Sequence, residues 1–181
     1  MGAGMYEESW RDELILRPVG YVRSPLKAPP TRSEDSHLSE REQMEYIRRR
    51  VKQVQELVSE LVIDTELAGL LDDIEEFSHI VVLYWPHLLG DERRGLVHVH
   101  PMGLKGIPPK GIFATRSPAR PNPVLVSTVE LLEHDGNILK VKALEAVDGS
   151  PIIDIKPYVE IYPEIKTPRF SRWLKLALEE P

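Results

Sequence analysis

Three prolines stiffen one short segment of this chain and limit the backbone shapes that it can take. The segment, residues 111–127, reads GIFATRSPARPNPVLVS and lies between two apolar, strand-like runs. Its prolines are Pro118, Pro121 and Pro123. Each proline fixes its own φ angle and pushes the preceding residue toward extended geometry. We therefore expect a rigid loop, from Thr115 to Val124, that presents Arg116 and Arg120 to an anion without a large ordering cost.

Short strand-like runs dominate most of the remaining chain. They occupy residues 14–23, 77–85, 96–99, 111–115, 124–132, 138–143, 152–155 and 159–162. The first run contains Pro18 and Gly20, which suit an edge strand or a bulge. An Asp-Gly turn signal at residues 135–136 predicts a hairpin between two of the runs. Many short strands with turns about every 8–12 residues are typical of a β-sandwich or β-barrel.

One helix is predicted at residues 39–61. Ser39 and Glu42 form the S-x-x-E capping box that often begins a helix. An apolar stripe with heptad spacing follows, made of Met44, Ile47, Val51, Val54, Val58 and Leu61. Soluble proteins usually avoid such an exposed stripe, so we expect it to be buried on its own domain or on a second subunit. The like charges of Arg48 and Arg50 oppose a parallel in-register pair, which favours docking on the domain or an antiparallel, offset contact.

Length and composition restrict the class of protein. The chain has 181 residues, which favours one domain with a real core. It has no cysteine, so disulfides and zinc-thiolate sites are excluded. No apolar run approaches the roughly 20 residues of a membrane helix, and we expect a cytoplasmic protein. We divide the chain into a flexible tail (1–13), a β-rich domain (14–165) with a helical insertion at about 38–61, and a C-terminal helical segment (166–181).

The formal net charge of −6 counts against a broad nucleic-acid surface. An RNA substrate would need a local basic patch. One candidate is the run of arginines and lysine at residues 48–52. The other is Lys166, Arg169, Arg172 and Lys175, with Phe170 and Trp173 interleaved. Either patch could equally be a solvated helix face, as charged runs often are.

Two sequence blocks resemble the TsaA-like, or tRNA methyltransferase O (TrmO, YaeB-type), family. They are ATRSPARPNP at residues 114–123 and DGSPIIDIKPY at residues 148–158. The likeness continues through LRPVGYVRSP and EEFSHIVVLYWPH and covers most of residues 14–162. It implies a mainly β (α+β) fold with a small β-barrel core, a long inserted helix and a C-terminal helix. No GxGxxG or Walker-type loop is present, so a Rossmann methyltransferase is not expected.

The resemblance also implies a function. It predicts a homodimeric, S-adenosylmethionine (SAM)-dependent tRNA methyltransferase that methylates N6 of threonylcarbamoyladenosine next to the anticodon. Alternatives are a SAM-dependent enzyme acting on a small molecule or protein, and a non-catalytic module that binds SAM or RNA.

The family's cofactor pocket can be carried over by position. The implied SAM-binding residues are Pro30, Thr31, Arg32, His87, Leu88, Arg116, Val126, Glu145, Asp148, Gly149, Ser150 and Pro151. Two departures stand out. Leu125-Val126-Ser127 replaces the family's frequent Gly-Leu-Ser, and residues 30–32 replace its Pro-Arg-Gln.

The acceptor nitrogen in such a reaction is a poor nucleophile and needs a base for its proton. His87 and Asp154 are the candidate bases, and Arg120 is the third predicted catalytic residue. The predicted substrate-binding residues are Arg120, Asn122, Lys156, Tyr158, Arg169, Arg172 and Lys175. Arg116 and Arg120 suit bidentate grips on carboxylates, although both could instead tie the loop to Asp148 or Asp154. His87 could equally be a strand-end histidine bonded to a backbone carbonyl.

A metal is not expected. His98 and His100 lie two residues apart, a spacing that can hold a metal, but no cysteine or nearby carboxylate completes a shell.

Overall fold

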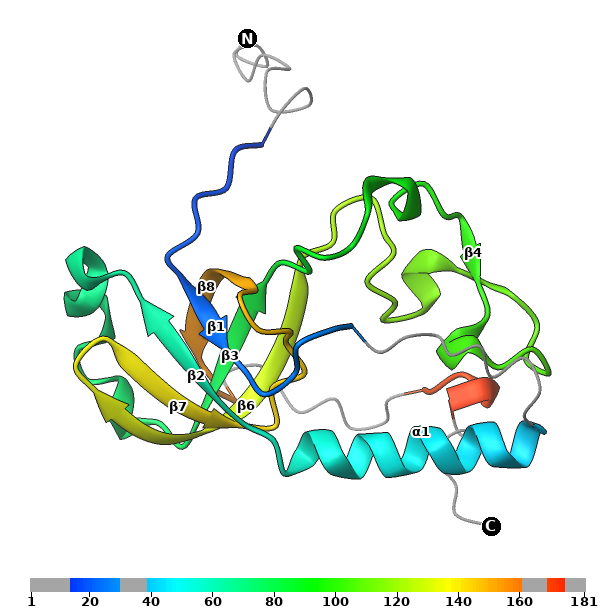
Figure 1. Cartoon of the computed structure of the whole chain (residues 1–181), viewed down its shortest axis with the longest axis horizontal. Coiled ribbons are helices and arrows are strands. Elements are labelled where there is room, and N and C mark those ends of the chain that lie inside the picture. The colour runs from blue at the N-terminus through cyan, green and yellow to red at the C-terminus, as the bar shows by residue number, and fades with distance from the viewer. Residues whose placement is uncertain (1–13, 30–38, 161–168, 175–181) are drawn as a thin grey trace, which may run out of the picture.

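The computed structural model describes residues 14–29, 39–160 and 169–174. Its core is a closed, six-stranded antiparallel barrel with the strand order β1-β2-β7-β6-β3-β8 (Figure 1). The strands are β1 (Gly20–Arg23), β2 (Val58–Ile63), β3 (His79–Tyr84), β6 (Leu125–Asp135), β7 (Ile138–Lys142) and β8 (Pro151–Pro157). This architecture confirms the predicted mainly β fold with a barrel core.

Alternating side chains fill the barrel. Within β2 and β3 every second residue is buried, which is the two-residue period of a strand that faces a core on one side. The fully buried interior residues include Val22, Leu61, Ile80, Val82, Leu139, Val141 and Ile152. Burying each such side chain contributes about 1.5–3 kcal/mol to folding. Closure of the sheet leaves no free edge, so the barrel is a rigid frame for the segments at its ends.

The N-terminal strand differs from the prediction in length and position. β1 begins at Gly20 rather than at residue 14, and it pairs with β2 on one side and β8 on the other. Gly20 is therefore not an edge residue. A Cβ placed on it would lie 2.2 Å from the carbonyl oxygen of Val62. The glycine allows the close approach of β1 to β2.

The hairpin between β6 and β7 is confirmed. Asp135 pairs with Ile138, which leaves a two-residue loop of Gly136 and Asn137. Gly136 has a φ of +58°, as the first residue of such a loop requires in a type II′ turn. The backbone of Asn137 also accepts a 2.9 Å hydrogen bond from the amide of Ile63, which ties the turn to β2.

The helix α1 (Glu40–Gln55) begins as predicted. The Ser39 amide donates to the Glu42 carboxylate at 2.8 Å, and the Glu42 amide donates to the Ser39 hydroxyl at 3.4 Å. The predicted end of the helix at Leu61 is wrong. Residues 58–63 form β2, and Leu61 is fully buried inside the barrel. The run VSELVI also alternates with period two, and pairing with both β1 and β7 favours the strand.

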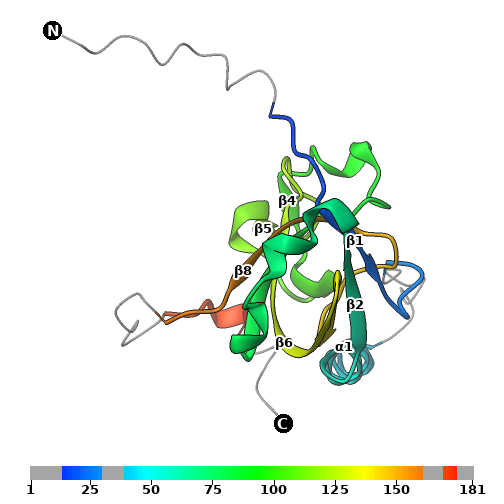
Figure 2. The same ribbon diagram turned by 90° about the vertical axis from the view of Figure 1, so that its left-hand side faces the viewer.

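The apolar stripe is expected to be buried on the barrel or on a second subunit, and the first of these alternatives is not seen. Figure 1 shows α1 running out from the end of β2, beyond the barrel, and Figure 2 shows it end-on beside β2. Met44, Ile47 and Val54 are only half-buried, and Val51 is 46% exposed. The stripe therefore remains partly open in a single chain.

Residues 85–124 leave the barrel between β3 and β6, and we call them the lobe (Figure 1). The lobe contains a small two-stranded sheet of β4 (His98–Val99) and β5 (Lys110–Gly111). Three 3-10 turns accompany it: η4 (Asp91–Arg93), η5 (Pro101–Gly103) and η6 (Ile112–Ala114). The strand predicted at 111–115 is thus mostly a 3-10 turn, which leads into the proline-rich loop.

Several other elements depart from or extend the predictions. Two 3-10 helices, η2 (Thr65–Leu71) and η3 (Ile74–Glu76), connect β2 to β3. Val159 and Glu160 are not in a strand, and the rest of that predicted run lies outside the described residues. Residues 172–174 are helical, whereas the remainder of the predicted C-terminal helix and the tail 1–13 are not described. Within the described residues, no helix is both long and apolar enough to cross a membrane.

Candidate functional site

Four segments meet at one end of the barrel. They are the end of β3 with His87, the start of β6, the loop at residues 115–124, and the connection from β7 to β8 at residues 143–150. That connection is anchored in the core, because Leu144 and Ala146 are fully buried and Ser150 is 1% exposed. Its first residue, Ala143, has a φ of +70°, a left-handed geometry that is uncommon for a residue with a Cβ. A register shift between β3 and β8 at Leu83 and Tyr84 lies at the same end.

The turn at Asp148-Gly149-Ser150 packs against His87. The hydroxyl of Ser150 lies 3.4 Å from Nδ1 of His87. Gly149 has a φ of +79°, and a Cβ on it would lie 3.6 Å from Nε2 of His87. Gly149 itself therefore places no side chain against this part of the imidazole. The structure thus brings His87 together with residues 148–151, as the sequence predicts.

The side chain of Asp148 ties this turn to the chain after β1. One carboxylate oxygen accepts a 2.9 Å hydrogen bond from the Ser24 amide, and the other pairs with Lys27 at 2.9 Å. The Lys27 ammonium, and then the Ser24 amide, lower the pKa of Asp148 below its ordinary value. The carboxylate thus orients the turn. Residues 30–32, the other predicted part of the pocket, lie outside the described residues.

Backbone carbonyls hold both loop arginines. Arg120 donates from Nε to the carbonyl of Ser117 at 2.9 Å and from Nη2 to that of Thr115 at 2.7 Å. Arg116 donates from Nη2 to the carbonyl of Val126 at 2.6 Å and is otherwise exposed. In the described part of the chain neither arginine pairs with a carboxylate, so the ties to Asp148 or Asp154 considered above are not seen. Arg120 mainly shapes the loop, while Arg116 keeps donors that face solvent.

Tyr84 joins these segments and was not singled out from the sequence. Its side chain is 4% exposed, its hydroxyl donates to the carbonyl of Glu145 at 3.2 Å, and Ser127 Oγ lies 3.4 Å away. Burial is the main cause that raises the pKa of Tyr84; the Ser127 hydrogen bond and the charge of Arg116 oppose this rise, whereas the charge of Glu145 adds to it. A tyrosine at the end of an apolar strand gives only a weak signal, because the same pattern is typical of core residues.

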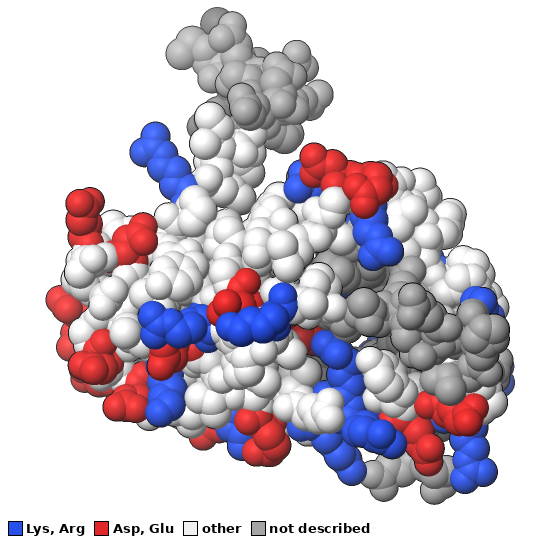
Figure 3. All heavy atoms as spheres, in the orientation of Figure 1, with Lys and Arg blue, Asp and Glu red and all other residues white. Residues whose placement is uncertain are grey.

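The helix α1 also reaches this end of the barrel, and Lys and Arg side chains gather over the half of α1 nearest the barrel (Figure 3). Arg50 Nη2 lies 3.5 Å from a carboxylate oxygen of Glu145, and the Arg50 side chain is 24% exposed. The same Nη2 atom is buried and has no hydrogen-bond partner among the described residues. The basic run at 48–52 is therefore not simply a solvated face. The contact joins residues far apart in the sequence, which a local pattern cannot reveal.

Asp154 and Lys156 lie on the outer wall of the barrel. Asp154 pairs with Lys156 at 2.5 Å and accepts the Ile155 amide at 2.9 Å. Asp154 stands opposite Leu83 on β3, and Leu83 stands opposite Val126 on β6. Asp154 is thus in the same cross-strand row as the predicted cofactor residue Val126.

The remaining predicted residues have few contacts with this cluster in the described part of the chain, or lie outside that part. The Tyr158 ring meets His79 edge-on with ring centroids 6.5 Å apart, at the opposite end of β3 from Tyr84. Asn122, Arg169 and Arg172 are exposed, and Lys175 is not described. Leu88, which follows His87, is 52% exposed.

The two histidines with metal-like spacing, His98 and His100, have different surroundings. His98 lies on β4, while Nδ1 of His100 is 2.8 Å from the carbonyl of Ile107. Among the described residues, no group of three His, Cys, Asp or Glu side chains is arranged to hold a metal ion.

Comparison with known proteins gives consistent matches. The family model for the tRNA-methyltransferase O N-terminal domain matches residues 37–163. A probable S-adenosyl-L-methionine-binding protein of Methanothermobacter thermautotrophicus is 44% identical and covers 82% of this chain and 92% of its own. An S-adenosyl-L-methionine-binding protein of Archaeoglobus fulgidus is 39% identical and covers 80% of this chain and 89% of its own.

Two longer proteins match over part of their length. The tRNA (adenine(37)-N6)-methyltransferase of Escherichia coli is 43% identical over 51% of this chain and 40% of its own. A crystal structure of TrmO is similar in fold, with a TM-score of 0.60 at 24% identity, over 87% of this chain and 63% of that one. The chain therefore corresponds to about two fifths of the bacterial enzyme and to less than two thirds of the TrmO structure.

Proposed function

Because the chain belongs to the tRNA-methyltransferase O family, we propose that it is a SAM-dependent methyltransferase that modifies tRNA. The observation that carries this proposal is the clustering at one barrel end. His87 lies against Gly149 and Ser150 just after β3. The side chain of Tyr84, at the end of the same strand, bonds the Glu145 carbonyl and lies near Arg116, which in turn bonds the Val126 carbonyl. Apart from Tyr84, these are positions that the family resemblance assigns to the cofactor.

The chemistry of the cluster suits SAM. When bound, SAM supplies a methyl group activated by a sulfonium, together with a carboxylate, an amine and an adenine. Arg116 offers solvent-facing donors for a carboxylate. The His87 imidazole, against which Gly149 places no side chain, offers a flat surface. Glu145, which is 50% exposed at its side chain, offers a negative charge for a cationic group.

Of the two candidate bases, His87 is the better placed. It lies in the cluster itself and its Nε2 faces the space beside Gly149. The Asp154 carboxylate is already paired with Lys156 on the outer wall. We infer that His87 accepts the proton of the acceptor nitrogen, which is N6 of a threonylcarbamoyladenosine next to the anticodon. The protein also holds the methyl donor and the acceptor nitrogen in line, and this positioning lowers the activation barrier further.

We also infer that two copies of the chain associate through α1. The stripe of Met44, Ile47, Val51 and Val54 is incompletely covered, and Val51 is 46% exposed. A second copy would bury this apolar surface. A Val51→Glu, Val54→Glu double variant should then be folded but show half the native mass by light scattering. A cytoplasmic location follows from the tRNA substrate, because tRNA is modified there.

One alternative has specific support. The archaeal relatives that match nearly end to end are described only as SAM-binding proteins, while the chain covers 40% of the bacterial methyltransferase. In this alternative the protein binds SAM without transferring its methyl group. We would titrate the folded protein with SAM by calorimetry and then supply methyl-labelled SAM with tRNA. Binding with label in tRNA supports the enzyme, and binding without label supports the non-catalytic alternative.

A further inference from the structure

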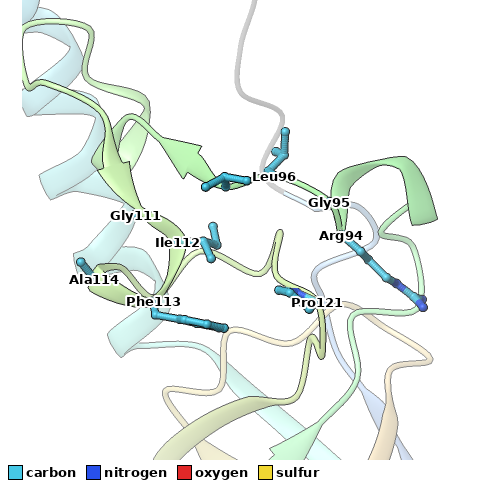
Figure 4. Close-up of a pocket in the computed structure, with 9 residues that line it drawn as sticks. Arg94, Gly95, Leu96, Gly111, Ile112, Phe113, Ala114 and Pro121 are labelled. Atoms are coloured by element: carbon cyan, nitrogen blue, oxygen red, sulfur yellow. The ribbon is translucent and has the colours of Figure 1, made fainter. Parts of the chain in front are cut away.

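An open apolar hollow lies in the lobe, apart from the cluster described above (Figure 4). Its volume is about 390 Å³, and Leu96, Ile112, Phe113 and Pro121 contribute side chains to it. None of its lining residues belongs to the cluster of His87, Glu145 and residues 148–151. It is therefore a separate feature of the molecule.

Phe113 dominates this hollow. Its side chain is 80% exposed, which is unusual for a phenylalanine, and its ring extends along the rim of the hollow in Figure 4. Val97 is 68% exposed beside it. Phe113 sits on η6, one turn before Arg116, and the Thr115 hydroxyl holds that turn by donating to the Ile112 carbonyl at 2.9 Å. The ring is thus presented on a fixed backbone.

The lobe that holds the hollow carries a net positive charge. The lobe (residues 85–124) holds six Lys and Arg residues against two Asp and Glu residues, a formal charge of +4 in a chain of −6. One of the two acids, Asp91, is already paired with Arg94 at 2.9 Å. Arg94 lines the hollow, and its guanidinium also lies 5.2 Å from the Trp85 ring centre, so its position is fixed from two sides. This charge favours a polyanion over another apolar surface.

An exposed aromatic ring in an open apolar hollow, on a lobe of net positive charge, is the kind of arrangement that binds an unstacked base of single-stranded RNA. We propose that the hollow takes a nucleobase of the tRNA anticodon loop, stacked on Phe113, with the loop phosphates near the lobe's basic residues. This inference rests on the proposed function. It adds a second contact that positions the RNA while the modified adenosine occupies the cluster.

Two variants and a control test the stacking contact. Phe113→Leu keeps an apolar side chain but removes the ring, and Phe113→Tyr restores a ring. Leu70→Ala is the control, because Leu70 is 73% exposed on η2, at the end of the molecule away from the lobe (Figure 1). Since Phe113 is exposed, its replacement should leave the melting temperature unchanged, which circular dichroism checks.

The assay uses anticodon stem-loop RNA with 2-aminopurine placed at one loop position at a time. At one or two positions the fluorescence should be quenched by the native protein and by Phe113→Tyr, but not by Phe113→Leu. Phe113→Leu should also weaken RNA binding by about 10–100-fold, as removal of one stacked base does. Leu70→Ala should bind like the native protein, and all variants should bind SAM equally.

Three results would overturn the inference. Phe113→Leu could bind RNA as the native protein does. It could lose SAM affinity instead, which would show that the hollow binds the adenine of SAM and not a base of the tRNA. It could lower the native mass with unchanged RNA affinity, which would make the hollow an interface between copies. If the native protein methylates tRNA while Phe113→Leu behaves normally, only this inference falls; if it binds no RNA at all, the proposed function falls with it.

Discussion

Replacing Gly149 with alanine tests the cofactor pocket at a single atom. Gly149 has a φ of +79°, a left-handed conformation that costs an L-residue about 1–2 kcal/mol. The added Cβ would lie 3.6 Å from Nε2 of His87, an ordinary contact that adds no clash. For a chain of this size each kcal/mol lowers the melting temperature by about 2–4 °C. The expected loss is therefore about 2–8 °C.

The effect on SAM binding should be much larger than this backbone cost explains. The new methyl group would cover the side of the imidazole that we assign to the cofactor. Gly136→Ala is the matched control, because Gly136 also has a positive φ of +58° but has nothing within 4 Å of its Cβ position. We expect both variants to melt at similarly reduced temperatures and only Gly149→Ala to lose SAM affinity in calorimetry. If folded Gly149→Ala binds SAM as tightly as Gly136→Ala, the pocket is not beside His87.

Three further changes probe the barrel and the loop. Gly20→Ala should destabilise the protein by about 1–3 kcal/mol, the usual cost of overpacking, because the Cβ would lie 2.2 Å from the Val62 carbonyl oxygen. Denaturant titrations measure this loss, and an unchanged midpoint would contradict the close pairing of β1 with β2. The hydrogen bond to Glu75 raises the pKa of His134, so this contact stabilises the fold below the ordinary histidine pKa of about 6.5 and is lost as the pH rises through the raised value. In His134→Gln the melting temperature should therefore depend less on pH between those two values. A pH profile equal to that of the native protein would show that the contact contributes nothing. Arg116→Ala should reduce the rate of methyl transfer far more than it reduces stability. A variant with a lowered melting temperature and full activity would show that Arg116 serves the structure and not the reaction.

The β-rich architecture could be predicted from the sequence because its signals are local, whereas the choice of a barrel over a sandwich came from the family resemblance. Alternating apolar residues and the Asp-Gly turn are visible within short windows. The helix end could not be predicted, since residues 58–61 fit both a heptad and a strand period. Only pairing with β1 and β7, which are distant in sequence, decides for the strand.

The candidate site divides in the same way. His87 and residues 148–151 were predicted from their sequence blocks, and the structure brings them together. Tyr84 and Arg50 were missed in this role. Each acts through a contact with Glu145 that forms only when β3, α1 and the β7–β8 connection meet. Arg120 shows the reverse case, because its predicted role in catalysis came from a motif, whereas its observed bonds stiffen its own loop.

The most direct test of the central claim is mass spectrometry of tRNA nucleosides after incubation with the protein and SAM. The tRNA should come in two forms, with and without the threonylcarbamoyl group on the adenosine next to the anticodon. We predict that this adenosine becomes heavier by one methyl group only in the modified tRNA, and that His87→Asn and Gly149→Ala reduce the product while Gly136→Ala does not. Unmethylated nucleosides after incubation with folded, SAM-binding protein would contradict the account.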